Sequence, residues 1–231
     1  MVLILGIDDA GRGPLIGPMI LAGVLMEKKD EKKFKSLGVT DSKLLNHAQR
    51  IQLEKEIKSK VISYEIVKSS PDEIDDAVES INLNTLEAKK AAEVINIINK
   101  GKYHNQKINI IIDCPSNNIL SWKNTLIKFI KYKDNLDIKC EHKADFNHPS
   151  VSAASILAKC VREEEVAKIK EKYKDCGDTG SGYPSDPNTI EFLKKNGKKL
   201  ENSGIFRKSW STWKSLFPGK KQATLGDFNK D

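Results

Sequence analysis

Four aspartates stand where apolar segments of this sequence end. Asp8 and Asp9 end the first apolar run, Asp113 ends KINIIID, and Asp145 follows DIKCEHK. Strand interiors disfavour Asp, so a role other than strand formation is expected for these residues. In open α/β sheets, sites form at strand ends, and acids that lie more than a hundred residues apart in the sequence can meet there.

Carboxylates that crowd together repel one another and take up protons unless cations neutralise them. Four carboxylates without His or Cys suit a hard ion such as Mg²⁺ or Mn²⁺. Two such ions can activate a water molecule and stabilise the leaving oxygen of a phosphodiester. A single Asp at a strand end is more often a turn former or a helix cap, but the set of four predicts a two-metal nuclease.

The elements that must position these acids follow from the apolar pattern. Strands are predicted at 2–8, 19–26, 61–68, 107–113 and 137–143. Helices are predicted at about 47–58, from Asn84 as N-cap with Glu87 three residues on to Gly101, and from Pro149 to about Lys174. Strands that first cluster and then alternate with helices indicate a mixed sheet with helices on its faces.

The glycine-rich stretch GRGPLIG, at residues 11–17, could form a phosphate loop in a nucleotide-binding enzyme. A dinucleotide fingerprint needs a helix that opens at its third glycine, whereas Pro14 and Pro18 interrupt this stretch and a strand follows. That class therefore stays a disfavoured alternative. Backbone N–H groups of these glycines, with Arg12 between them, could instead hold a nucleic-acid backbone or a sugar hydroxyl.

The composition is that of a globular protein, with 39% apolar and 31% charged residues in 231. No run approaches the roughly 20 apolar residues that span a bilayer, and the opening MVLILGI lacks the basic flank of a signal peptide. We expect a cytoplasmic protein without a membrane segment. The four cysteines form no CxxC pair, which indicates free thiols rather than a zinc site.

Positive charge is concentrated near the C-terminus. Residues 191–221 contain eight Lys and one Arg against two Glu, a net charge of +7. This asymmetry suggests a polyanionic partner, although a solvated lysine-rich surface would give the same counts. Trp210, Trp213 and Phe217 have helical spacing, which predicts a core-facing aromatic side and a basic side with Arg207, Lys208 and Lys214 free to touch DNA phosphates.

The sequence resembles ribonuclease HII, and its archaeal branch best, in five motifs that follow the order of that family. They are GIDDAGRGPLIGPM, DSKLL, IIDCPSNN, EHKADFNHPSVSAASILAK and GSGYPSDP. The resemblance spans roughly residues 3–217. It implies a ribonuclease H-like α/β fold with a small C-terminal helical extension. The implied activity is metal-dependent endonucleolytic cleavage of the RNA strand in RNA–DNA hybrids and at ribonucleotides embedded in duplex DNA, leaving 3′-hydroxyl and 5′-phosphate ends.

The resemblance also implies roles for particular positions. By position, the family's metal-binding acids are Asp8, Asp9, Asp113 and Asp145, and its junction-reading turn is Gly11, Arg12 and Gly13. Tyr183 matches the tyrosine that stacks beside the sugar at the RNA-to-DNA junction. Two further matches are to basic positions near substrate phosphates, Lys43 and Lys143.

One position departs from the family pattern, because Asp9 stands where the family usually has Glu. Its side chain is one methylene shorter, and neighbouring residues on a regular strand point to opposite faces. We therefore expect the strand to bend before Asp9 if that residue reaches the metal site. A weakened or non-catalytic hybrid-binding protein is the alternative that this departure leaves open.

The last residues, QATLGDFN at 222–229, resemble the short motif by which DNA-repair enzymes bind the sliding clamp. Gln222, Leu225 and Phe228 have its spacing, so a clamp is an expected partner besides the nucleic acid. Residues 1–185 are predicted to form the catalytic domain, 186–217 a helical substrate-binding extension, and 218–231 a flexible tail. We expect the protein to be a monomer.

Overall fold

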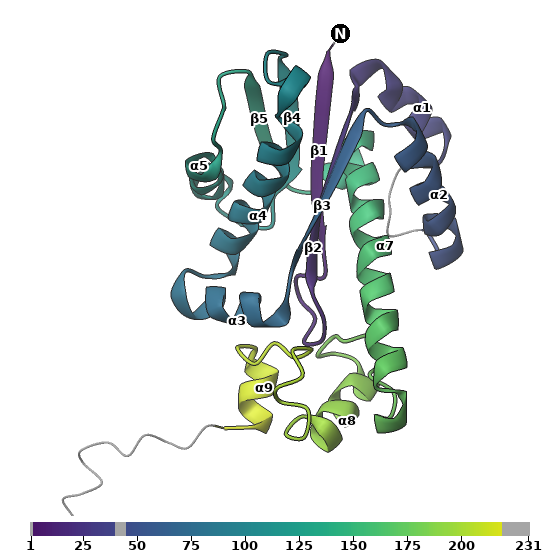
Figure 1. Ribbon diagram of the computed structural model, residues 1–231, viewed down its shortest axis with the longest axis vertical. Helices are drawn as coiled ribbons and strands as arrows, with labels where there is room; N and C mark the ends of the chain where they lie inside the picture. The colour runs from purple at the N-terminus through teal and green to yellow at the C-terminus, as the bar shows by residue number, and fades with distance from the viewer. Residues whose placement is uncertain (1, 40–44, 219–231) are drawn as a thin grey trace, which may run out of the picture.

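A mixed five-stranded sheet lies at the centre of the computed structural model, which describes residues 2–39 and 45–218 (Figure 1). The strands are β1 (Leu3–Ala10), β2 (Met19–Glu27), β3 (Ser63–Ser69), β4 (Ile108–Asp113) and β5 (Leu136–Glu141). Their order is β3-β2-β1-β4-β5, in which β1–β2 and β2–β3 are antiparallel while β1–β4 and β4–β5 are parallel. The predicted mixed sheet is confirmed.

Helices cover both faces of this sheet. They are α1 (Glu31–Ser36), α2 (His47–Lys60), α3 (Pro71–Ser80), α4 (Leu83–Ile98), α5 (Ile119–Phe129), α6 (Ala144–Asn147), α7 (Pro149–Lys172), α8 (Pro187–Asn196) and α9 (Ser211–Leu216). Short 3₁₀ turns are η1 (Lys28–Asp30), η2 (Gly101–Tyr103) and η3 (Lys174–Cys176). Helices α4 and α5 lie on one side of the sheet, and α7 and α2 lie on the other (Figure 1).

The two faces are built from alternate residues of β1. Leu3, Leu5 and Ile7 are buried in the core that contains α4, whereas Ile4 belongs to the core that contains α7. Gly6 shares the α7 face, where an added Cβ would lie 2.2 Å from the backbone carbon of Ser150. Glycine is therefore required at this position, because the first turn of α7 lies directly against β1.

The C-terminal part forms a third apolar cluster with the loop between β1 and β2. Leu15 and Ile16 of that loop are buried against Phe192, Phe206 and Trp213 from the segment that contains α8 and α9. This contact joins the C-terminal segment to the loop that follows the first acids. In the described parts of the chain, the helices are too short or too polar to cross a membrane.

The predicted start of α4 is wrong by two residues. Asn82, not Asn84, is the N-cap, and its side-chain oxygen accepts a hydrogen bond from the Thr85 N–H at 3.0 Å. Glu87 does not complete a capping box but is buried, with 1% of its surface exposed. The helix also ends at Ile98, before Gly101.

Helices α1, α3, α5 and the short α6 were not predicted from the sequence, and α3 and α5 are the longer ones. Helix α3 has an N-cap, Ser70, whose hydroxyl accepts a hydrogen bond from the Glu73 N–H, and Pro71 is its first residue. These are ordinary helix-start signals. Helix α3 lies beside the C-terminal segment, where Asp75 accepts hydrogen bonds from the Lys208 and Ser209 N–H groups.

Candidate active site

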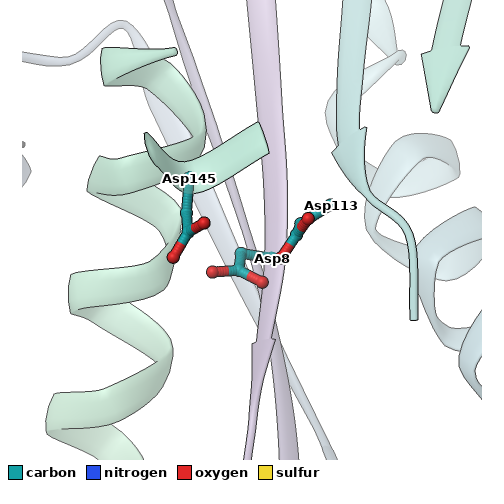
Figure 2. A group of neighbouring side chains, drawn as sticks. All are labelled: Asp8, Asp113 and Asp145. Atoms are coloured by element: carbon teal, nitrogen blue, oxygen red, sulfur yellow. The ribbon is translucent and has the colours of Figure 1, made fainter. Parts of the chain in front are cut away.

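Three of the four predicted acids meet at one edge of the sheet (Figure 2). Asp8 comes from β1, Asp113 from the end of β4, and Asp145 from α6. One carboxylate oxygen of each lies within 4.8 Å of the others. Asp8 and Asp145 are buried and Asp113 is half-buried, so the acid triad of Asp8, Asp113 and Asp145 is a partly enclosed group of negative charge.

Backbone contacts fix two of these carboxylates. Asp113 Oδ1 accepts a hydrogen bond from the Ala144 N–H at 3.0 Å, which holds the start of α6 against the end of β4. Asp8 Oδ1 accepts from the Asp9 N–H at 2.7 Å. Because Ala144 is bonded to Asp113, the next residue, Asp145, is held close to the other two acids.

The electrostatics of the triad favour a cation. Burial raises the pKa of Asp8 well above its usual value, Asp9 and Asp113 raise this pKa further, and a hydrogen bond with Ser155 opposes them. A divalent ion would offset both the burial and the repulsion. Since the three donors are carboxylates, the group fits a hard ion such as Mg²⁺ or Mn²⁺.

Asp9 does not join the triad within the described residues. The expected bend of the strand is absent there, because β1 keeps its regular pairing with β2 through Asp9 and Ala10. Alternation therefore turns Asp9 toward the α4 face, away from Asp8. The pKa of Asp9 is raised to about 6, mainly by burial and also by Asp113, while Arg12 opposes the rise.

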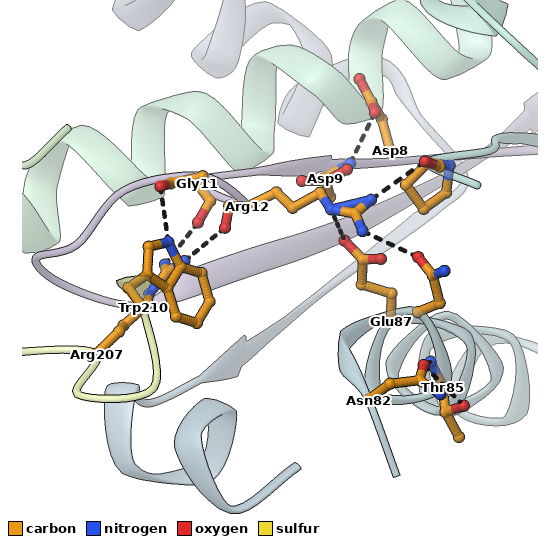
Figure 3. A network of polar contacts seen from close by, with 12 residues as sticks. Asp8, Asp9, Gly11, Arg12, Asn82, Thr85, Glu87, Arg207 and Trp210 are labelled. Atoms are coloured by element: carbon orange, nitrogen blue, oxygen red, sulfur yellow. Dashed lines mark hydrogen bonds and ion pairs between the residues drawn. The ribbon is translucent and has the colours of Figure 1, made fainter. Parts of the chain in front are cut away.

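Arg12 reaches from the glycine-rich turn to α4 (Figure 3). Its Nε lies 3.4 Å from Glu87 Oε1, its Nη2 donates to Asn84 Oδ1 at 2.9 Å, and its Nη1 donates to the Pro115 carbonyl at 3.2 Å. The side chain is thus engaged inside the protein. What the turn can offer a ligand is its backbone.

Glu87 is a site residue that the sequence analysis missed, because its spacing from Asn84 suggested a cap. The pKa of Glu87 is raised to about 8, mainly by burial and then by Asp9, while Arg12 and Arg207 oppose the rise. In the metal-free protein this carboxyl therefore carries a proton at neutral pH. The sequence did contain a sign of burial, because Glu87 lies one helical turn before apolar residues of α4. A capping residue does not have to lie on the apolar face of its helix.

A groove of about 760 Å³ runs beside the turn. Gly11, Arg12, Gly13 and Tyr183 line it together with the basic side chains Arg50, Lys159, Arg162 and Lys170. Tyr183 is 45% exposed, and a Cβ added to Gly13 would lie 3.7 Å from its ring. The tyrosine and the turn, 170 residues apart in the sequence, therefore lie side by side on the groove wall.

The remaining predicted residues fall into two groups. Lys143 is exposed beside the triad, in a left-handed backbone conformation with φ 56° immediately before α6. Lys43 and the tail residues Gln222, Leu225 and Phe228 lie outside the described residues.

The predicted exposed basic face near the C-terminus is wrong for Arg207. This side chain is completely buried and donates to main-chain carbonyls. The helix also starts later than the aromatic spacing suggested, because Trp210 is the N-cap of α9. A buried arginine and an exposed one have the same sequence pattern, so spacing could not separate them.

The comparisons with known proteins agree with this geometry. The family model described as Ribonuclease HII matches residues 5–213. A ribonuclease HII of Methanocaldococcus jannaschii is 41% identical over 234 residues, covering 97% of this chain and 99% of its own.

Two solved structures share the architecture. The ribonuclease H2 of Pyrococcus horikoshii has a TM-score of 0.78 at 32% identity, over 93% of this chain and 97% of its own. A chain of the PCNA–RNase HII complex of Archaeoglobus fulgidus has a TM-score of 0.77 at 35% identity, over 97% of this chain and 100% of its own. The mixed sheet, its flanking helices and the C-terminal helix are those of a ribonuclease H-like fold. The chain therefore belongs to the ribonuclease HII family, whose members are metal-dependent endoribonucleases with ribonuclease H activity on RNA–DNA hybrids.

Proposed function

We propose that this protein hydrolyses the RNA strand of RNA–DNA hybrids and cuts duplex DNA at embedded ribonucleotides, leaving 3′-hydroxyl and 5′-phosphate ends. The observation that carries the proposal is the acid triad, whose oxygens lie within 4.8 Å of one another in a ribonuclease HII frame. The groove beside it has basic residues and an exposed tyrosine, as a nucleic-acid site requires.

The residues fit two divalent ions, Mg²⁺ or Mn²⁺. Asp8, Asp113 and Asp145 would hold them. Asp9 lies outside this triad and is one methylene shorter than the usual Glu of the family, so it would contribute a fourth carboxylate only from the α4 side of β1. When bound, such ions activate a water molecule and stabilise the charge on the leaving oxygen. Without them, burial and mutual repulsion keep the pKa of Asp8 raised, so its carboxyl tends to hold a proton.

Substrate recognition is assigned to the turn and to Tyr183. We propose that the backbone of Gly11, Arg12 and Gly13 meets the 2′-hydroxyl, the group that separates RNA from DNA. The ring of Tyr183 would pack on the sugar at the RNA-to-DNA junction. Lys143, and Lys43 outside the described residues, would lie near substrate phosphates.

The test is cleavage of defined duplexes by the purified protein. One duplex carries a single ribonucleotide, a second is an RNA–DNA hybrid, and an all-DNA duplex of the same sequence is the control. We expect cleavage of the first two with Mg²⁺ or Mn²⁺ and none with EDTA, with 5′-phosphate ends identified by mass spectrometry. Binding of the ribonucleotide duplex without cleavage under any metal would instead identify a non-catalytic hybrid-binding protein.

A sliding clamp is the proposed protein partner. The Archaeoglobus fulgidus relative was solved in a complex with PCNA, and the residues at the spacing of a clamp motif here are Gln222, Leu225 and Phe228. Because Asn229 stands where a second aromatic anchor is usual, we expect a dissociation constant in the micromolar range, about −8 kcal/mol.

Calorimetry of the full chain against the clamp of the source organism tests this partner. Phe228→Ala should abolish the binding heat, whereas Lys230→Ala should leave it unchanged. No binding at high micromolar concentration, or equal binding by Phe228→Ala, would show that the tail motif does not bind the clamp.

The domain division is also a proposal. It places the catalytic domain at residues 1–185, the helical substrate-binding extension at 186–217 and the tail at 218–231.

A further inference from the structure

The three carbonyl groups of the glycine-rich turn are all bound by two residues of the C-terminal segment (Figure 3). Arg207 donates from Nη2 to the Gly11 carbonyl at 2.5 Å and from Nη1 to the Arg12 carbonyl at 2.7 Å. Trp210 donates from Nε1 to the Gly13 carbonyl at 3.0 Å. The backbone of the turn is thus fixed on one side by donors that come almost two hundred residues later in the chain.

The Arg207 side chain forms its hydrogen bonds with the protein and not with solvent. Its side chain is fully buried, and its remaining hydrogen bonds run from Nε and Nη2 to the Gly17 carbonyl at 3.1 and 3.0 Å. Burial lowers the pKa of Arg207 to about 9, so the guanidinium is still charged at neutral pH. A buried cation is costly unless its donors are paired, and here carbonyls of residues 11–17 accept from it.

The segment that presents these donors is itself tied down. Asp75, a buried residue of α3, accepts from the Lys208 N–H at 2.7 Å, the Ser209 N–H at 2.9 Å and the Ser209 hydroxyl at 2.6 Å. The Arg207 N–H donates to the Leu15 carbonyl at 2.9 Å. The guanidinium also lies over the Trp210 ring, 5.0 Å from its centre. Arg207 and Trp210 therefore have little freedom to move relative to the turn.

This arrangement occupies the carbonyl groups of the turn. With its carbonyls turned toward the C-terminal segment and the Arg12 side chain bound to α4, the turn has its N–H groups left for a ligand. In the described parts of the chain, no main-chain carbonyl accepts a hydrogen bond from the N–H of Arg12 or Gly13. Both residues line the groove beside Tyr183.

We propose that Arg207 and Trp210 are positioning residues for ribonucleotide recognition. They orient the N–H groups of the turn by holding its carbonyls, so the C-terminal segment acts on the 2′-hydroxyl through the turn. This inference rests on the proposed function. It assigns the segment a part in substrate selection that is separate from any contact of its own with DNA.

Trp210→Phe is the cleanest test, because an aromatic ring is kept while the N–H donor to the Gly13 carbonyl is lost. We expect the KM for duplex DNA with one ribonucleotide to rise about fivefold with kcat nearly unchanged, as expected for one net hydrogen bond. Arg207→Lys keeps the charge but not the fork, and should raise KM about tenfold or more. The affinity for Mg²⁺ should not change in either variant.

Phe192→Leu is the matched control, since Phe192 packs on Phe206 in the same C-terminal cluster. It should lower the melting temperature without raising KM. Unchanged KM in Trp210→Phe and Arg207→Lys, or an equal rise in Phe192→Leu, would overturn the inference. Wild-type protein that cleaves no ribonucleotide duplex would instead contradict the proposed function itself.

Discussion

Asp8 and Asp9 are adjacent in β1, yet they face opposite sides of the sheet. Asp8 lies in the triad with Asp113 and Asp145, and the neighbours of Asp9 on the α4 side include Arg12. Regular pairing of β1 with β2 continues through both residues, so alternation rather than a bend sets their directions. The two acids therefore cannot be interchangeable metal ligands.

Asp9→Glu tests whether the reach of this side chain limits the enzyme. A carboxylate one methylene longer should extend toward Asp113 and raise turnover at limiting Mg²⁺, by up to about tenfold or 1.4 kcal/mol. Initial rates across a Mg²⁺ titration measure the effect. Lower activity at every Mg²⁺ concentration would mean that the site has adapted to Asp.

The strands were the most predictable part of this protein, and the positions of the acids at their ends were predicted together with them. Apolar runs identified all five strands, because buried strands need such runs whatever surrounds them. The triad followed from the rule that strand ends gather at one edge of a sheet. Helices α3 and α5 could have been found from their N-caps, which are Ser70 and Asn118.

Roles that depend on tertiary contacts could not be predicted. Glu87 looked like a capping residue and Arg207 like an exposed cation, because sequence spacing records neither burial nor the distant partner of a side chain. Both contact residues more than 70 positions away, in the glycine-rich turn. The bend expected at Asp9 failed for the same reason, since pairing with β2 keeps the strand regular.

Metal binding at the triad should release protons. Because burial and the neighbouring acids raise the pKa of Asp8, the metal-free site holds protons that a divalent ion must displace. We expect Mg²⁺ affinity to increase as the pH rises, because the carboxyl must lose its proton to bind the ion. Calorimetry in buffers with different ionisation enthalpies would detect the released protons, and an affinity that does not change with pH would contradict the assignment.

Glu87→Gln should flatten the pH dependence of stability. Burial raises the pKa of Glu87 from 4.5 to about 8, so its protonated form stabilises the native state fully below pH 4.5. That contribution is lost as the pH rises to about 8. Urea unfolding at pH 5 and pH 9 in EDTA should show a smaller loss of stability in the variant than in the wild type. An equal loss in both proteins would mean that Glu87 titrates near its usual pKa.

Tyr183→Ala should impair cleavage at single ribonucleotides. Removing the exposed ring from the groove would lose its packing on the junction sugar. With the about 1–3 kcal/mol of base–aromatic stacking as a guide, kcat/KM should fall roughly 5- to 150-fold. Tyr183→Phe keeps the ring and should retain most of the activity. Unchanged kinetics in Tyr183→Ala, with unchanged discrimination against all-DNA duplex, would exclude the proposed role.

The triad is the centre of this account, and Asp113→Asn is the substitution that tests it most directly. An Asn oxygen can still accept from the Ala144 N–H, so the fold should survive while one ligand charge is lost. The measurement is single-turnover cleavage of duplex DNA with one ribonucleotide, in saturating Mg²⁺, for the wild type, Asp113→Asn and Asp145→Asn. We predict rates lower by several orders of magnitude in both variants, with unchanged circular dichroism. Near-normal cleavage by either variant would contradict catalysis by metal ions held at Asp8, Asp113 and Asp145.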